Sequence, residues 1–177
     1  VAPLSPGASQ KRLARIPLDG SAPATTLVDW KDSWGSGVEL ENGDWLIPEG
    51  QSTFVRLAKG GGAPSAPVTI DAGRPGVSFY TLTGAAVPGD RGAFVNVVSY
   101  DARGWHYSVG VMDVGTGKVK VMEEDGGNAR YSPTGHLLFS RGDTVLAVPF
   151  DPERLEVRGA PVAVWSGLST PYAFNPG

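Results

Sequence analysis

The sequence predicts an all-β protein built from repeated strand units, and the first observation behind this is a recurring turn signal. Four turns contain Gly43, Gly89, Gly135 and Gly177, so their spacings are 46, 46 and 42 residues. The first three of these turns lie beside apolar, β-rich segments. A period of about 40–50 residues with strand-type units is typical of a β-propeller or a solenoid. We therefore predict an all-β fold that forms a portion of a β-propeller.

Composition is the second observation. The 177 residues include 25 glycines and 15 prolines, which is too many for a helical protein. These residues fall between apolar runs, so we interpret them as turns between strands. The segment 118–121, Lys-Val-Lys-Val, alternates polar and apolar residues as a half-buried strand does. A chain of this length can bury a core as one domain.

Charge and cysteine content exclude several functions. The net charge is −3 with scattered charges, so we expect no nucleic-acid partner and no membrane partner. We find no signal peptide and no run of 18 apolar residues, and so expect a soluble protein. The chain has no cysteine, which excludes disulfides, thiolate chemistry and cysteine-bound zinc. The same absence leaves the compartment unassigned.

Each repeat is predicted to be a four-stranded antiparallel meander with strands a to d. Tight turns such as Asp19-Gly20 and Asn42-Gly43 are the expected chemistry for this arrangement, and 60–62 and 115–117 are glycine-containing turns. The predicted units are a partial blade over 11–28, complete blades over 34–70, 77–122 and 128–164, and a partial blade over 168–177. Their strands are 12–18 and 24–28; 35–40, 44–48, 53–58 and 67–70; 78–87, 92–100, 105–114 and 118–122; 129–132, 136–140, 144–150 and 161–164; and 171–174.

Several segments carry a family resemblance. Residues 128–139, Asn-Ala-Arg-Tyr-Ser-Pro-Thr-Gly-His-Leu-Leu-Phe, resemble the a–b hairpin of TolB-type, WD40-like propeller repeats. Residues 143–164 resemble the propeller fused to bacterial serine/threonine kinases, and 13–20 and 111–117 resemble the c–d hairpin of that family. The resemblance implies a non-catalytic propeller module for protein interaction or sensing. None of the kinase motifs is present: no glycine-rich loop with a catalytic lysine, no His-Arg-Asp and no Asp-Phe-Gly.

The blade prediction places the d–a and b–c loops on one face, where polar residues gather. We expect the candidate catalytic residues to be His106, Glu124 and Asp125, and the candidate ligand-binding residues to be Asp71, Arg74 and Trp105. Trp30, Trp34 and Trp165 are expected in the same set of loops. Carboxylates at the mouth of a propeller can hold a divalent cation, and a cation can polarise an ester or phosphoryl oxygen.

Two interpretations of these loops stay open. One is a hydrolase of activated esters or phosphotriesters with its site at the mouth of an assembled propeller. The other is that the acidic loop residues are solvated turns. No cofactor is evident beyond the possible divalent cation.

The order of the predicted strands also predicts a partner. The chain begins with a c–d hairpin and stops after one strand a. Exposed strand edges invite pairing with another chain. We therefore expect a homodimer in which each N-terminal hairpin completes the other chain's C-terminal blade and two chains form one ring.

Overall fold

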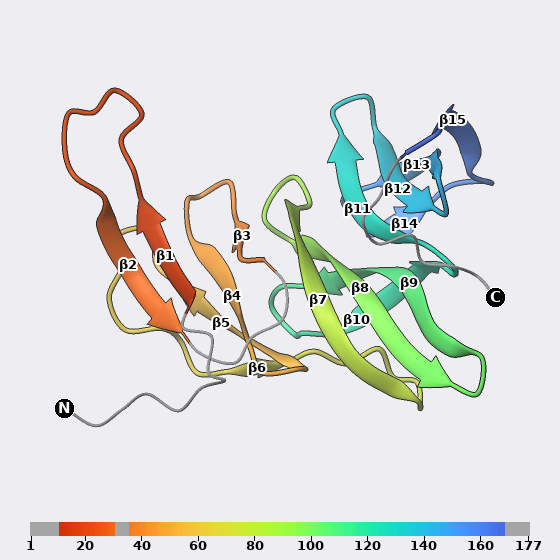
Figure 1. Cartoon of the computed structure of the whole chain (residues 1–177), viewed down its shortest axis with the longest axis horizontal. Helices are drawn as coiled ribbons and strands as arrows, with labels where there is room; N and C mark the ends of the chain where they lie inside the picture. Colours follow the sequence, from red (N-terminus) through yellow and green to blue (C-terminus); the bar gives the residue numbers. More distant parts are fainter. Residues whose placement is uncertain (1–10, 31–35, 169–177) are drawn as a thin grey trace.

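The computed structural model describes residues 11–30 and 36–168, and this part of the chain is all-β, as predicted (Figure 1). Its strands form four antiparallel sheets that follow one another in sequence order. The strands are β1 (Lys11–Arg15) and β2 (Thr25–Trp30); β3 (Val38–Glu39), β4 (Trp45–Glu49), β5 (Thr53–Leu57) and β6 (Val68–Thr69); β7 (Val77–Ala86), β8 (Gly92–Asp101), β9 (Gly104–Asp113) and β10 (Val119–Glu123); and β11 (Gly127–Ser132), β12 (His136–Arg141), β13 (Thr144–Asp151), β14 (Glu156–Val157) and β15 (Val162–Ser166).

Each sheet is an antiparallel meander, as the repeat predicts. The N-terminal hairpin contains β1 and β2, and the next two sheets run β3-β4-β5-β6 and β7-β8-β9-β10. The last sheet differs at its edge, because β14 and β15 both pair with β13. β14 pairs at Phe150 and Asp151, whereas β15 pairs over 144–147. The sequence prediction missed β14 and gave one strand at this position.

Two other strand predictions need correction. The first strand was predicted over 12–18 but ends at Arg15, because Pro17 has no N–H for a ladder and its carbonyl accepts a turn hydrogen bond from the Gly20 N–H at 3.3 Å. The strand predicted over 35–40 is limited to β3. The predicted partial blade over 168–177 lies outside the described residues except for Leu168, as do the first two residues of the predicted blade 34–70.

Three of the four turns that gave the repeat lie within the described residues, and they have the backbone geometry that requires glycine. Gly43, Gly89 and Gly135 have φ of 85°, 80° and 82°. Two of these turns also contact each other across sheets. The Asp90 carboxylate accepts hydrogen bonds from the backbone N–H groups of Glu41 and Asn42, the latter at 3.0 Å. The β3–β4 and β7–β8 turns are therefore joined by polar contacts as well as by the core.

The hydrophobic core lies between successive sheets rather than inside any one of them. Three clusters of apolar side chains join the N-terminal hairpin to the β3–β6 sheet, that sheet to the β7–β10 sheet, and the β7–β10 sheet to the last sheet. In β8, Ala93–Val98 are all buried, with Phe94 on the face toward the last sheet and Val95 on the other face. The rings of Phe94 and Phe150 lie 5.5 Å apart.

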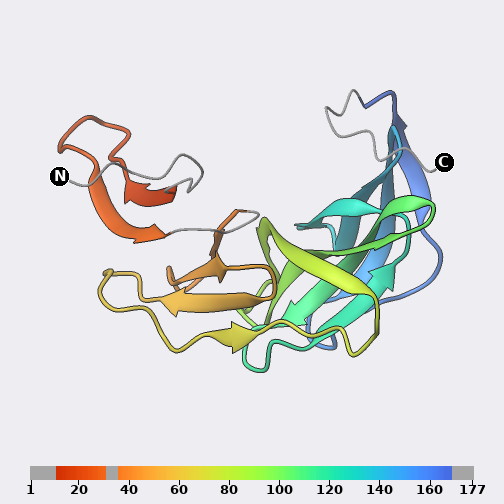
Figure 2. The same ribbon diagram turned by 60° about the horizontal axis from the view of Figure 1, so that its bottom comes forward.

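The first strands of the three larger sheets lie next to one another. β7 contacts β3 on one side and β11 on the other. The sheets follow one another from β3 to β15 in both views (Figures 1 and 2). A backbone bridge between Asp71 and Lys118 also joins the connection after β6 to the start of β10. No helix long and apolar enough to cross a membrane occurs within 11–30 and 36–168.

Candidate functional site

The six residues predicted to form a site come from three segments of the molecule. Asp71 and Arg74 lie in the connection between β6 and β7, and Glu124 and Asp125 lie between β10 and β11. Trp105 and His106 lie at the start of β9, as the strand predicted over 105–114 requires, and so not in the loop before it. Of the other tryptophans expected in loops, Trp30 lies in β2, Trp165 lies in β15, and Trp34 is outside the described residues.

Arg74 and Glu124 are brought together, although 50 positions separate them in the sequence. Arg74 Nη1 donates to Glu124 Oε1 at 2.7 Å, and Arg74 Nη2 donates to Ser108 Oγ at 3.0 Å. The Ser108 hydroxyl in turn donates to Glu124 Oε2. Ser108 is 3% exposed and was not predicted from the sequence. These three side chains form a closed set of hydrogen bonds, which we call the Arg74–Ser108–Glu124 cluster.

The cluster favours the ionised form of Glu124. Desolvation favours the neutral acid, but the hydrogen bonds from Ser108 and Arg74 and the charge of Arg74 outweigh it, so the pKa of Glu124 lies below its ordinary value. A carboxylate of low pKa is a weak general base. The buried Ser108 hydroxyl is also withheld from any substrate in solution. The cluster therefore links β9 by hydrogen bonds to the β6–β7 connection and to the β10–β11 connection.

His106 forms a separate pair at the β8–β9 turn. Its Nε2 lies 2.7 Å from Asp101 Oδ1, and the same oxygen accepts a hydrogen bond from the Arg103 N–H at 2.7 Å. The hydrogen bond from His106, followed by that from Arg103, lowers the pKa of Asp101. Because side chains alternate along a strand, His106 lies on the same sheet face as Ser108. Asp101 is therefore a turn-forming residue whose carboxylate already has two partners.

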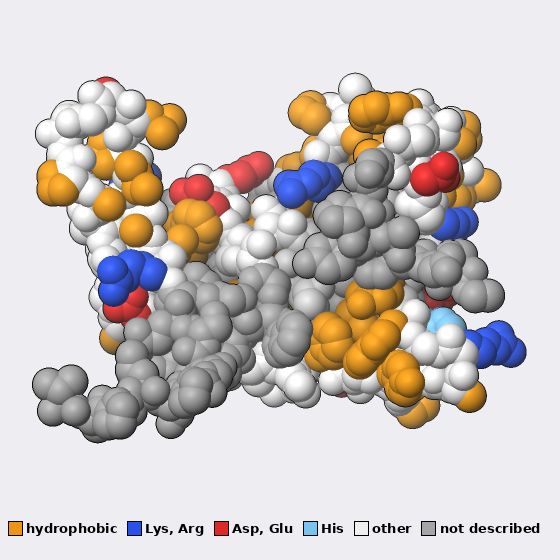
Figure 3. All heavy atoms as spheres, viewed as in Figure 1, with side chains coloured by type: hydrophobic (Ala, Val, Ile, Leu, Met, Phe, Trp, Pro, Cys, Tyr) orange, Lys and Arg blue, Asp and Glu red, His pale blue; other side chains and the backbone are white. Residues whose placement is uncertain are grey.

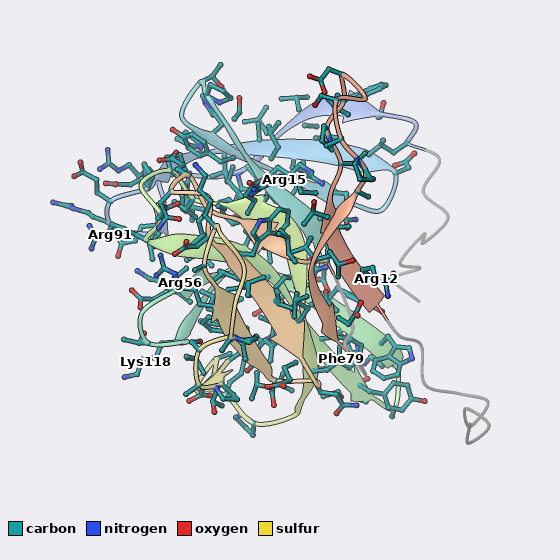
Figure 4. The ribbon with its side chains drawn as sticks, turned by 90° about the vertical axis from the view of Figure 1, so that its left-hand side faces the viewer. Arg12, Arg15, Arg56, Phe79, Arg91 and Lys118 are labelled. Atoms are coloured by element: carbon teal, nitrogen blue, oxygen red, sulfur yellow. The ribbon has the colours of Figure 1, made fainter. Side chains whose placement is uncertain are left out.

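Trp105 lies on the opposite face of the same sheet from His106, because adjacent strand residues point to opposite sides. Its ring centroid lies 4.8 Å from that of Tyr100 and 5.6 Å from that of Phe79. Trp105 is 53% exposed and Tyr100 is 61% exposed. We call these three residues the aromatic cluster. Figure 3 shows hydrophobic side chains exposed over the lower part of the β7–β10 sheet, and Figure 4 shows Phe79 near the end of that sheet.

The remaining two predicted residues form turns. Asp71 Oδ1 accepts a hydrogen bond from the Gly73 N–H at 2.7 Å. Asp125 has φ of 54°, and its backbone carbonyl accepts a hydrogen bond from Arg141 Nε at 3.1 Å. The structure thus pairs Arg74 with Glu124, and it separates Trp105 from the predicted catalytic residue His106. A site that draws on all six residues stays a prediction.

The described part of the chain holds no group of three or more His, Asp or Glu side chains arranged for a metal ion. It does have a shallow hollow of about 480 Å³ next to β2, β4 and β5. The hollow is lined by Val28, Asp29, Ile47, Pro48, Glu49, Val55, Pro64, Ser65 and Pro67. None of the six predicted site residues lines it.

Comparison with known proteins adds no family to this description. A scan against protein-family models gives no match, and a search of curated proteins gives none either.

Proposed function

We propose that the chain is a non-catalytic module of the β-propeller type that binds other proteins, and that the aromatic cluster is its contact surface. The observation that carries the proposal is the position of Trp105 and Tyr100, two large aromatic side chains that are each more than half exposed and in contact with each other. Tryptophan and tyrosine are enriched among the residues that dominate binding energy at protein interfaces. Exposed apolar clusters of this kind mark interaction sites.

The order of the sheets supports the propeller part of the proposal. Three successive antiparallel meanders pack face to face, and their first strands β3, β7 and β11 are neighbours. In a propeller, the inner strands of adjacent blades are arranged in this way around a central axis. The TolB-type resemblance of 128–139 agrees with this arrangement and remains part of the proposal.

The engagement of the predicted catalytic groups supports the non-catalytic part. Glu124 accepts hydrogen bonds from Arg74 and Ser108, and Ser108 is itself buried. A general base needs a free lone pair directed at substrate, and a nucleophilic serine needs exposure. In this structure Glu124 and Ser108 are instead hydrogen-bonded to each other and to Arg74.

Exposed aromatic rings favour a partner that is an extended peptide with proline or apolar side chains. A displayed peptide library selected on the protein provides the probe, and calorimetry with a soluble monovalent form of the selected peptide measures its affinity. We expect Trp105→Ala to weaken binding by about 30-fold or more, since truncating an interface hot spot costs about 2 kcal/mol or more. Trp165→Ala is the matched control, because Trp165 is 67% exposed on another sheet.

The proposal fails if no peptide is selected, or if the Trp105 and Trp165 variants bind equally well. The hydrolase alternative is tested separately with a chromogenic ester and a phosphotriester, each with and without a chelator. Turnover that Glu124→Gln or His106→Ala abolishes would replace the interaction proposal with the catalytic one.

A further inference from the structure

The hollow next to β2, β4 and β5 has an apolar floor. Its lining includes Val28 from β2, Ile47 from β4 and Val55 from β5. These side chains take part in the apolar cluster that joins the N-terminal hairpin to the β3–β6 sheet, and Ile47 and Val55 are buried. The volume of about 480 Å³ falls within the range of sites that bind small molecules or side chains. The floor therefore offers a surface for a hydrocarbon group.

The rest of the lining offers few hydrogen-bond donors. Three of the lining residues are Pro48, Pro64 and Pro67, and proline has a carbonyl group but no N–H. The Ser65 hydroxyl also lines the hollow, but it already donates to the Ala66 carbonyl at 3.0 Å. None of the lining residues, which all belong to the described part of the chain, is a lysine or an arginine. The hollow is therefore suited to a ligand that supplies the donors itself.

Glu49 gives the hollow an unpaired negative charge. It follows Ile47 by two positions in β4, so both side chains project from the same face of the sheet. Within the described part of the chain, the Glu49 carboxylate has no hydrogen bond and no ion pair. Asp29, the other acidic lining residue, differs, because Arg12 Nε donates to its carboxylate at 2.7 Å. One free carboxylate therefore stands beside the apolar floor.

We propose that this hollow binds a lysine side chain of a partner protein. The methylene groups of the lysine cover the floor formed by Val28, Ile47 and Val55, and its ammonium group donates to the Glu49 carboxylate. The hollow is shallow, so it suits a side chain that enters from a second molecule better than a small ligand that has to be enclosed. The site shares no residue with the aromatic cluster, and the proposal does not depend on that surface.

Other ligand classes match the lining less well. A carboxylate or phosphate group would be repelled by Glu49 and would find no cationic side chain among the lining residues. A quaternary ammonium group is typically held by aromatic rings, and none of the lining residues is aromatic. A neutral apolar group would desolvate the Glu49 carboxylate without giving it a partner. Arginine has the same charge as lysine but a planar head on a shorter stem, so it is included as a probe.

Nuclear magnetic resonance of the isotope-labelled full chain tests the site with three capped amino acids. The probes are the N-acetyl methylamides of lysine, norleucine and arginine, and norleucine keeps the alkyl stem of lysine without its ammonium group. We expect the lysine probe to shift the amide signals of Val28, Ile47 and Glu49. We also expect it to bind about threefold more tightly than the norleucine probe, which is the gain that an exposed ion pair gives. Salt at about 1 M should remove this difference, because it screens the charge of Glu49.

Two matched variants test the role of the carboxylate. Glu49→Gln keeps the size of the side chain, and we expect it to lower the affinity for the lysine probe to that for norleucine. Glu39→Gln is the control, because Glu39 is exposed in β3 of the same sheet and does not line the hollow. The same spectra show that both variants are folded. Unshifted signals, equal binding of lysine and norleucine, tighter binding of arginine, or equal lysine affinity of the two variants would each overturn the proposal.

Discussion

Gly117 offers a sharp test of how the β3–β6 and β7–β10 sheets are joined. Its φ is 74°, and a Cβ atom placed on it would lie 2.0 Å from the Thr69 carbonyl oxygen. The contact is with backbone, which cannot rotate away as a side chain can. Gly117→Ala therefore requires the bridge between Asp71 and Lys118 to shift.

The cost follows from two effects. An L-residue in the left-handed region costs about 1–2 kcal/mol. Movement of the bridge loses two hydrogen bonds, from the Asp71 N–H to the Gly117 carbonyl at 3.0 Å and from the Val119 N–H to the Asp71 carbonyl at 2.7 Å. Each is worth about 0.5–1.5 kcal/mol. We expect Gly117→Ala to lower the free energy of unfolding by about 2–5 kcal/mol.

Gly135→Ala separates the two effects. Gly135 has φ of 82°, and nothing lies within 4 Å of its added Cβ, so only the conformational cost applies. Urea unfolding of both variants, followed by tryptophan fluorescence, should show a loss of about 1–2 kcal/mol for Gly135→Ala and a clearly larger loss for Gly117→Ala. Equal losses would show that the bridge contributes nothing and would refute the reasoning.

Two further predictions concern the core and the polar cluster. Phe94→Ala removes a fully buried ring that packs against Phe150, and we expect a loss of about 3–5 kcal/mol in urea unfolding, whereas a loss below 1 kcal/mol would contradict the packing. The lowered pKa of Glu124 means that its ionised form stabilises the folded state above the ordinary glutamate pKa, and that this stabilisation disappears as pH falls through the folded pKa. Glu124→Gln should therefore destabilise the protein at pH 7 and progressively less in acid, and a deficit independent of pH would exclude the link to Arg74 and Ser108.

The sequence was most informative where structure is determined locally. Of the four glycines that gave the repeat, the three in the described residues, Gly43, Gly89 and Gly135, have the positive φ that tight turns need. The turn residues between apolar runs correctly placed most strands, and the polar–apolar alternation of 118–121 indicated β10. The prediction of one strand at 161–164 missed β14, since the pairing of both β14 and β15 with β13 depends on tertiary contacts.

The candidate site was harder to predict for the same reason. Arg74 and Ser108 are 34 positions apart, and Ser108 gives no local signal that it is buried or paired. Trp105 and His106 were expected in one cluster at a loop face, although they begin the strand predicted over 105–114; the structure has them in β9, so they point to opposite faces. Whether adjacent residues lie in a loop or in a strand therefore decides whether their side chains can contribute to the same site.

The way the core is divided between sheets has a consequence for local opening. Each apolar cluster belongs to two sheets, so a sheet that loses a neighbour also loses the cluster it shares with that neighbour. The β7–β10 sheet is covered on both faces, whereas the N-terminal hairpin and the last sheet each contribute to one cluster. Amide hydrogen exchange should therefore be slowest in β8 and grow faster toward both ends of the stack, with the N-terminal hairpin opening at the lowest free energy.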